Sequence, residues 1–196
     1  METHTIHGEQ CRTIFFIGKP GSGKGTQAKL LSEATGWPIR VASDGLREII
    51  AGGGVVGRKL KETMDAGFLT PSWFPGYLFI KWLSALPADG SVIFDGFNRK
   101  ISEAEFVSDA LKWIDRPFIV VDINVSDASI RERLKLRKEV EGRTDDAAVD
   151  KRFEEYYANT APVKEFFRKA GVLIEIDGEP TPEEIAVEIR EALGIK

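Results

Sequence analysis

A short glycine-rich segment near the start of the chain limits its possible folds more than any other feature. Gly18–Gln27 has the sequence GKPGSGKGTQ, follows the apolar run Thr13–Ile17 and precedes residues with helical spacing. Glycines permit the positive φ angles that turn backbone N–H groups inward. A helix start and the side chain of Lys24 add positive charge. The sequence therefore predicts a strand, a phosphate-binding turn and a helix N-terminus.

This segment departs from the general phosphate-loop pattern at one position. The pattern ends in Gly-Lys-Ser/Thr, whereas here Gly25 follows Lys24 and the hydroxyl comes one place later, at Thr26. A glycine-rich turn that binds nothing is the simpler alternative. The strand–turn–helix frame around the motif argues against it.

Composition limits the size and class of the molecule. A chain of 196 residues, 42% of them hydrophobic, can bury one sizeable α/β core. A net charge of −4 argues against general binding to nucleic acids or anionic membranes. The single cysteine, Cys11, permits no internal disulfide, which fits the cytoplasm, and no zinc site built on several cysteines. Met1–Arg12 is polar, so we expect neither a signal peptide nor a membrane span there.

Short apolar runs predict buried parallel strands, because their hydrophobic residues follow one another instead of alternating with polar ones. Helical segments separate the runs, which is the order of a doubly wound α/β fold with a five-stranded parallel sheet. In such a sheet, ligands bind outside the carboxyl ends of the strands. The predicted strands are Thr13–Ile17, Pro38–Ala42, Ser91–Asp95, Phe118–Asn124 and Val172–Asp177.

Two stretches, Ser43–Ser72 and Leu136–Val149, fit this alternation poorly and predict excursions from the core. Leu136–Val149 is charged and has little that could form a core. A solvated surface loop is its simplest interpretation, although its arginines favour a role in binding. The first stretch divides into two helical pieces and the glycines between them: Leu46–Ala51, Gly52–Gly54, Gly57 and Lys59–Ala66.

Charged side chains follow the predicted strands. Val92–Asp95 is an apolar strand that ends in an acid, and such an aspartate orients Mg²⁺ directly or through bound water. Each arginine near a strand end or in the charged excursion is, alone, most simply a surface charge. Together they suit phosphoryl transfer, in which arginine forks neutralise and position two polyanions. These arginines are Arg47, Arg99, Arg133, Arg137, Arg143 and Arg152.

The chain resembles the adenylate kinase family from about Thr13 to Ile195. The resemblance implies a P-loop NTPase-like α/β fold and a monomeric, cytoplasmic nucleoside monophosphate kinase that uses ATP with Mg²⁺. Several motifs in family order make it more specific than the glycine-rich loop alone. They are Gly18–Gln27, Asp44–Arg47, Met64–Gly67, Asp95–Phe97, Arg143–Asp146 and Thr160–Pro162.

The resemblance also implies one kinase domain over residues 12–196, with a flexible N-terminal tail at residues 1–11. The core would comprise residues 12–42, 73–135 and 150–196, with a monophosphate-binding insertion at 43–72 and a short lid at 136–149. Between Arg137 and Arg143 there is no room for the longer, zinc-binding kind of lid, so no zinc is expected.

Roles for individual residues follow from the same resemblance. Lys24 would hold the donor phosphates, Arg133 would stack on the donor base, and Asp95 would hold water on Mg²⁺. The implied ATP-binding residues are Gly21, Ser22, Gly23, Lys24, Gly25, Thr26, Arg133 and Arg137. The implied acceptor-binding residues are Ala42, Ser43, Arg47, Gly96, Phe97, Arg99, Glu103, Arg143 and Arg152. The implied catalytic residues are Lys24, Arg99, Arg137, Arg143 and Arg152.

The acceptor side departs from the family pattern. Ala42 stands where a hydroxyl often contacts adenine, Asn98 replaces a rigid proline, and Lys100 replaces the usual threonine. Glu103 stands where a glutamine contacts the acceptor base. A carboxylate only accepts hydrogen bonds, which suits guanine better than adenine unless Glu103 is protonated or pairs with Lys100. The alternative is a solvated Glu103 in the first turn of a helix.

The expected reaction is reversible transfer of the γ-phosphoryl group of ATP to AMP, giving two ADP, with no nucleic-acid or membrane partner. GMP or a pyrimidine monophosphate is an alternative acceptor. A nucleotide-binding regulator without catalysis is the alternative from another class. Met64–Gly67 and Arg143–Asp146 argue against a kinase of another small metabolite.

Overall fold

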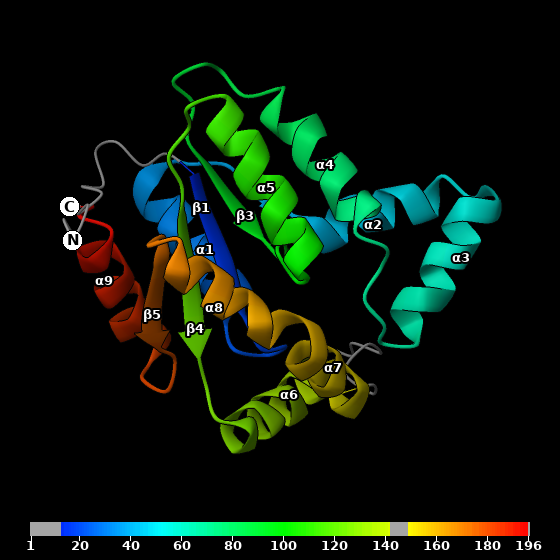
Figure 1. The fold of residues 1–196 in the computed structure, drawn as a ribbon. Coiled ribbons are helices and arrows are strands. Elements are labelled where there is room, and N and C mark those ends of the chain that lie inside the picture. The colour runs from blue at the N-terminus through cyan, green and yellow to red at the C-terminus, as the bar shows by residue number, and fades with distance from the viewer. Residues whose placement is uncertain (1–12, 142–148, 196) are drawn as a thin grey trace.

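The computed structural model describes residues 13–141 and 149–195, with side chains for 13–135 and 149–195. Its centre is a five-stranded parallel sheet in the order β2-β3-β1-β4-β5 (Figure 1). The predicted doubly wound sheet is confirmed, and each strand end lies within one residue of its prediction. The strands are β1 (Thr13–Gly18), β2 (Ile39–Val41), β3 (Val92–Asp95), β4 (Ile119–Asn124) and β5 (Leu173–Asp177).

Both faces of the sheet are buried. In β1, Ile14 and Phe16 join one hydrophobic core while Phe15 and Ile17 join the other, because successive strand residues point to opposite faces. This two-sided burial explains why β1 and β3 are almost continuously apolar in sequence. The prediction of a buried strand was wrong for β5, where only Ile176 is buried and Glu175 and Asp177 are exposed, because β5 lies at the edge of the sheet. The helices of the first core include α1 (Lys24–Thr35) and α9 (Pro182–Ala192).

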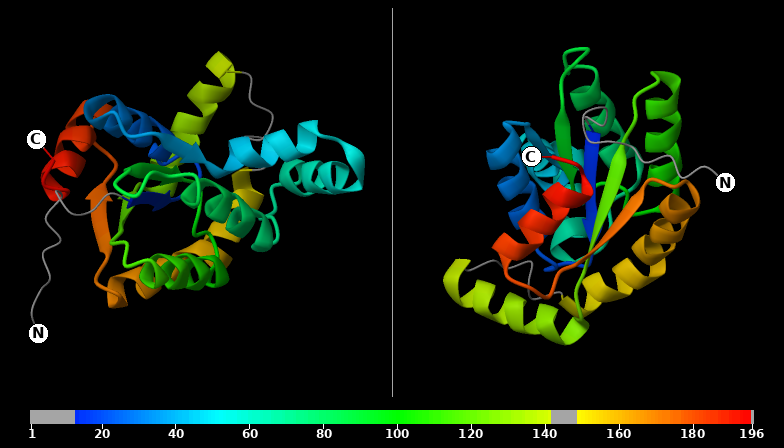
Figure 2. Two further views of the ribbon diagram at one scale, coloured as in Figure 1. Left: turned by 90° about the horizontal axis from the view of Figure 1, so that it is seen from above. Right: turned by 90° about the vertical axis from the view of Figure 1, so that its left-hand side faces the viewer.

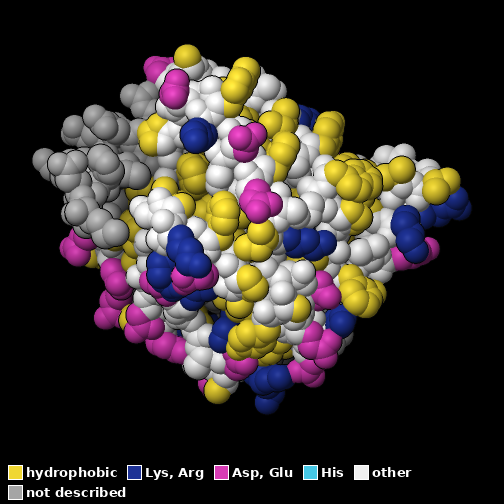
Figure 3. Space-filling view, viewed as in Figure 1, with side chains coloured by type: hydrophobic (Ala, Val, Ile, Leu, Met, Phe, Trp, Pro, Cys, Tyr) yellow, Lys and Arg dark blue, Asp and Glu magenta, His cyan; other side chains and the backbone are white. Residues whose placement is uncertain are grey.

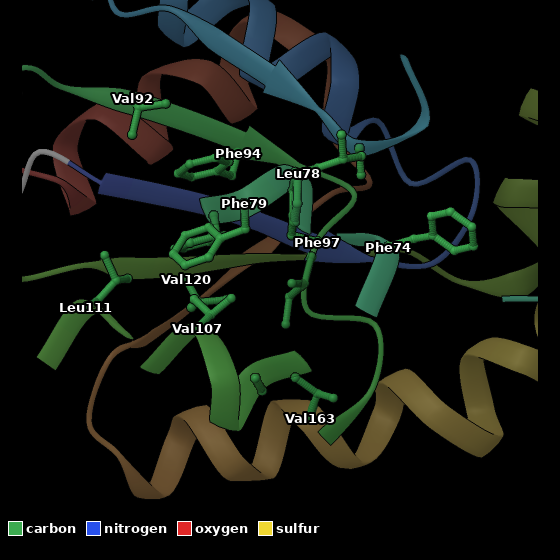
Figure 4. Close-up of a cluster of buried hydrophobic side chains, with 14 of the residues drawn as sticks. Phe74, Leu78, Phe79, Val92, Phe94, Phe97, Val107, Leu111, Val120 and Val163 are labelled. Atoms are coloured by element: carbon green, nitrogen blue, oxygen red, sulfur yellow. The ribbon is translucent and has the colours of Figure 1, made fainter. Parts of the chain in front are cut away.

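The second core is rich in phenylalanine. Phe15 stacks on Phe94 with 4.9 Å between ring centroids, and Phe79 packs beside both. Figure 4 shows Phe79 and Phe94 in this core. Three helices cover this face of the sheet: α4 (Trp73–Leu83), α5 (Ile101–Trp113) and α8 (Ala161–Lys169). Together the two cores fix the positions of the strand ends, from which the site is built.

Two helices, α2 (Ala42–Ala51) and α3 (Gly54–Asp65), form an arm that projects from the sheet (Figures 1 and 2). The prediction that Ala42 ends a strand was wrong, since it begins α2. Both helices also begin earlier than predicted. Asp44 lies in the first turn of α2, where a negative charge is favourable. Gly53, between the two helices, has a φ of 73° and therefore interrupts the helical conformation.

Gly57 was predicted to lie between the helical pieces and lies inside α3 instead. A Cβ atom there would be 3.0 Å from the carbonyl oxygen of Ile50 and 3.1 Å from that of Ile49. The glycine therefore permits close packing of α2 against α3. A glycine at this position therefore indicates that two backbones approach closely, and it does not indicate the end of a helix.

Consecutive helices follow β4: α6 (Asp127–Glu141), α7 (Val149–Glu155) and the π-helix η2 (Tyr156–Thr160), which continues into α8. Residues 136–141 are helical, so the interpretation of this part of the charged stretch as a surface loop was wrong. Helix α6 continues without interruption from Lys135 to Glu141.

Acidic and basic side chains are interspersed on the face of the molecule shown in Figure 3. The exposed basic residues Arg58, Lys59 and Lys61 lie on α3, at the projecting arm. Among the described residues, none of the helices combines the length and the hydrophobicity needed to cross a membrane.

Candidate active site

A cavity of about 1200 Å³ lies at the carboxyl ends of β1 and β3. Its wall includes the turn after β1, the arm, the residues after β3, and α6, α7 and η2. Pro180 and Pro182 also line it. The predicted position of the ligand site, outside the carboxyl ends of the parallel strands, is thus where the structure has a large cavity.

The turn after β1 has the geometry that its glycines predict. Gly18, Gly21 and Gly23 have φ angles of 138°, 83° and 96°. Helix α1 starts directly afterwards, and within this helix no side chain caps the N-terminus and no acid lies in the first turn. Its first backbone N–H groups and its positive dipole end are therefore available to an anion. Gly21, Ser22, Gly23, Gly25 and Thr26 all line the cavity.

Lys24 lies inside this turn. Its Nζ donates hydrogen bonds to the carbonyl oxygens of Gly18 at 2.9 Å and Lys19 at 2.6 Å. Burial lowers the pKa of Lys24 to about 8, with Asp95 opposing the shift and Arg99 and Arg152 adding to it. Three cationic side chains thus converge on one place, which favours a polyanionic ligand there.

Asp95, at the end of β3, is 9% exposed, and its Oδ1 has no hydrogen-bond partner among the described residues. Burial raises the pKa of Asp95, while Lys24 and Arg99 oppose the rise. A Cβ atom at Gly25 would be 3.4 Å from Oδ2 of Asp95, so the helix start lies against this carboxylate.

The donor atoms at Asp95 fit magnesium. Mg²⁺ binds oxygen ligands and is usually held by one or two carboxylates, with waters and substrate phosphates completing its shell. An unpartnered carboxylate oxygen beside the phosphate-binding turn meets that requirement. The part of the chain with described side chains contains no cluster of three or more His, Cys, Asp or Glu residues that could hold a metal ion.

Four of the six predicted arginines line the cavity: Arg47, Arg99, Arg133 and Arg152. Arg133 donates from Nη2 to the carbonyl oxygen of Gly178 at 2.8 Å, and Arg47 donates from Nη1 to Oδ1 of Asp44 at 2.8 Å. Ser43, Gly96 and Phe97 line the same cavity, and Ala42 lines the slot beside it. The side chain of Arg137 and the whole of Arg143 lie outside the described residues.

The main chain of Arg99 is held from both sides. Its N–H donates to Oε2 of Glu103 at 2.8 Å, and its carbonyl oxygen accepts from Oγ1 of Thr160 at 2.9 Å. The preceding Asn98 is fully buried with φ 58°, in the left-handed region. Thr160 closes η2, so the π-helix places this hydroxyl against the loop that carries Arg99.

Glu103 is buried, with 6% of its surface exposed. The interpretation of Glu103 as a solvated residue was therefore wrong. Burial raises the pKa of Glu103, while the N–H and charge of Arg99 and the charge of Lys100 oppose the rise. The Nζ of Lys100 donates to the carbonyl oxygen of Thr70 at 2.9 Å.

Several contacts at the site had no predicted role. Lys19 Nζ lies 2.5 Å from Oδ1 of Asp127, and the hydroxyl of Tyr157 donates to the same carboxylate at 2.8 Å. These bonds join the phosphate-binding turn to the start of α6 and to η2. Gln27, also buried, donates from Nε2 to the carbonyl oxygen of Pro182 at 2.9 Å. Of these residues, Lys19 and Gln27 had a signal in the sequence, because both belong to the glycine-rich motif.

Comparison with known proteins gives consistent matches. The family described as adenylate kinase matches residues 16–172. A protein named adenylate kinase from Maricaulis maris is 37% identical over 185 residues, covering 92% of this chain and 97% of the relative. Adenylate kinases from Thermus thermophilus and Archaeoglobus fulgidus are 35% and 30% identical, covering 94% and 92% of this chain and 98% and 97% of those proteins.

Proposed function

The chain belongs to the adenylate kinase family of nucleoside monophosphate kinases, and we propose that its cavity transfers the γ-phosphoryl group of ATP reversibly to AMP. The observation that carries this proposal is the convergence of Lys24, Asp95, Arg99 and Arg152 on one cavity at the carboxyl ends of the strands. Phosphoryl transfer needs little covalent chemistry from the protein and much positioning of charge.

On the donor side, the phosphate-binding turn and Lys24 hold the β- and γ-phosphates of ATP. The N-terminus of α1 adds its N–H groups and dipole. Arg133 borders the donor base, which sits between α6 and the segment Gly178–Pro182; the bond from Arg133 to Gly178 supports this position. Arg137 is proposed as a further ligand of the donor phosphates.

On the acceptor side, Arg47 and Arg99 bind the phosphate of AMP. Ser43, Gly96 and Phe97 border the same region, and Ala42 and Glu103 lie at the base end. Arg152 and Arg143 neutralise the group in transfer. The contacts that hold the main chain of Arg99 support its role, because a rigidly placed guanidinium stabilises developing charge without reorganising.

Magnesium is the proposed cofactor. Held near Asp95, Mg²⁺ would supply positive charge that offsets the negative charge of the reacting phosphates. Asp95 would orient it, directly or through water. We further propose that the insertion at residues 43–72 moves when the acceptor binds, that residues 136–149 serve as the short lid, and that the enzyme acts as a cytoplasmic monomer.

Initial rates of transfer from ATP to AMP, GMP, CMP, UMP and dAMP, each with Mg²⁺ and with EDTA, test the proposal. We expect transfer to AMP in the presence of Mg²⁺ and its loss in EDTA. Transfer to a pyrimidine nucleotide alone would replace the proposed acceptor. Nucleotide binding without transfer to any of them would favour a regulator over an enzyme.

A further inference from the structure

The loop between β3 and α5 forms part of the cavity wall and changes direction twice. Two of its residues have positive φ angles, Gly96 at 81° and Asn98 at 58°. Phe97, between them, is 2% exposed, and its ring packs edge-on against the rings of Phe94 and Trp82. Figure 4 shows Phe97 among the buried side chains of the second core. The loop is therefore anchored in the core at Phe97 and turns on either side of it.

The side chain of Arg99 lies back across this loop. A Cβ atom at Gly96 would be 3.0 Å from Nη2 of Arg99, so the guanidinium lies against the first residue of the loop. Both polar groups of the Arg99 main chain are already bonded, the N–H to Glu103 and the carbonyl oxygen to Thr160. The direction in which the chain reaches Arg99 is then set by the backbone conformation of the residue before it, Asn98.

The side chain of Asn98 does not explain why asparagine stands here. Asn98 is fully buried, and within the described part of the chain neither Oδ1 nor Nδ2 has a hydrogen-bond partner. A buried amide without such a bond lowers stability. The backbone gives a reason, because asparagine adopts positive φ more readily than most residues with a side chain. Proline, the residue of the family pattern, is fixed at a φ of about −65° and cannot take this conformation.

On the premise of the proposed function, we propose that Asn98 is a positioning residue: its left-handed backbone conformation directs the guanidinium of Arg99 over Gly96, toward the acceptor phosphate. A guanidinium that is in place before the substrate binds stabilises charge without reorganising. A negative φ at Asn98 would turn the chain away, so that Arg99 could not keep both main-chain bonds and its place over Gly96.

Two substitutions separate the backbone of Asn98 from its side chain. Alanine disfavours positive φ, and a small misplacement of a catalytic group is costly, so Asn98→Ala should lower kcat/KM for AMP by about ten- to hundredfold. The KM for ATP should stay the same. Glycine takes positive φ without strain, so Asn98→Gly should recover most of this loss although it also lacks the carboxamide. Initial rates with each substrate varied in turn, and calorimetric dissociation constants for AMP, measure these effects.

Asp115 provides a matched control. It is the other non-glycine residue with positive φ in the described part of the chain, at 51°, and it is exposed just after α5. Asp115→Ala introduces the same backbone strain away from the cavity. It should lower the melting temperature and leave kcat and both KM values unchanged. A loss of acceptor kinetics in Asn98→Ala alone would thus report on position and not on stability.

Equal impairment of Asn98→Ala and Asn98→Gly would assign the effect to the carboxamide and overturn the inference, as would unchanged acceptor kinetics in Asn98→Ala. Thermal unfolding shows whether each variant folds. Asn98→Ser, which also disfavours positive φ, replaces the alanine variant if that variant does not fold. The acceptor panel on the unmodified protein decides the proposed function. The inference depends on differences between variants, in binding as well as turnover, with the acceptor that the panel selects, so the two can fail separately.

Discussion

At the scale of a single residue, Lys24 is placed where it can bind phosphate, and this position lowers the stability of the folded protein. An ammonium group in the phosphate-binding turn loses hydration, and two arginine charges lie near enough to lower its pKa further. Its bonds to the carbonyl oxygens of Gly18 and Lys19 offset only part of this cost, since its pKa remains near 8. The folded pKa lies below the ordinary value of 10.5, so folding disfavours the charged form.

Replacing this lysine, Lys24→Met, should strongly reduce activity and stabilise the ligand-free protein. Loss of a positioned cation is expected to lower kcat by about 10²–10³-fold. Removal of a desolvated charge should raise the free energy of unfolding at pH 7 by an amount on the order of 1–3 kcal/mol. Steady-state kinetics and urea unfolding measure the two effects, with Lys81→Met on the surface of α4 as the control.

The stability difference should depend on pH with a definite sign. Between pH 8 and 10.5 the unfolded chain keeps the proton on Lys24 and the folded chain loses it, so the unmodified protein gains stability relative to the variant as pH rises. Urea unfolding at pH 7 and pH 10 measures this. An equal stability difference at the two pH values would contradict the lowered pKa, and near-normal turnover in the variant would contradict the proposed mechanism.

At the scale of an element, the α2–α3 arm depends on close packing of two helices. Gly57 lies where α3 meets the last turn of α2, and the atoms nearest to its missing side chain are backbone carbonyl oxygens. Backbone atoms cannot rotate away as a side chain does. The geometry of the arm, and with it the position of Arg47 on α2, therefore depends on this glycine.

Gly57→Ala is expected to push α2 and α3 apart. Overpacking of this kind costs about 1–3 kcal/mol, and the displaced arm should raise the KM for AMP severalfold while the KM for ATP stays the same. Gly76→Ala in α4 is the matched control: its Cβ would be 3.4 Å from the ring of Phe106, an ordinary contact, so it should gain helix propensity instead. Thermal unfolding and KM values for both substrates distinguish the two variants. Equal effects from both would show that the close approach at Gly57 has no consequence.

At the scale of the whole molecule, the cavity lies between the arm on one side and α6, α7 and η2 on the other. Phosphoryl transfer in an open cavity would lose the group to water, which is the reason for enclosure in such sites. The contacts of Lys19 with Asp127, and of Asp127 with Tyr157, fix the base of α6 and of η2 to the phosphate-binding turn. We therefore expect the outer end of the α2–α3 arm to move when substrates bind.

Binding of both substrates is therefore expected to make the molecule more compact. Small-angle scattering with and without a bisubstrate analogue measures the radius of gyration, which should decrease on binding. ATP alone should give a smaller decrease, because the arm would keep its place until the acceptor binds. Identical scattering profiles in all three states would contradict closure.

The sequence by itself determined the strands and the phosphate-binding turn. Both depend on local patterns: the runs in β1 and β4 are apolar because each residue is buried on one face or the other, and the turn needs glycine wherever φ is positive. The placement of Arg47, Arg99, Arg133 and Arg152 in one cavity followed from their positions near strand ends and in the flanking helices. The roles of these arginines stay predictions.

Only the tertiary structure decided the surroundings of those residues. The burial of Glu103, the bond from Thr160 to the carbonyl oxygen of Arg99, and the contact of Lys19 with Asp127 join groups that are separated in sequence or depend on what packs above them. The same holds for Gly57, whose pattern fits a helix break as well as a close approach. Local propensity acts over a few residues, whereas hydration, charge and close contact depend on which distant segments the folded core brings together.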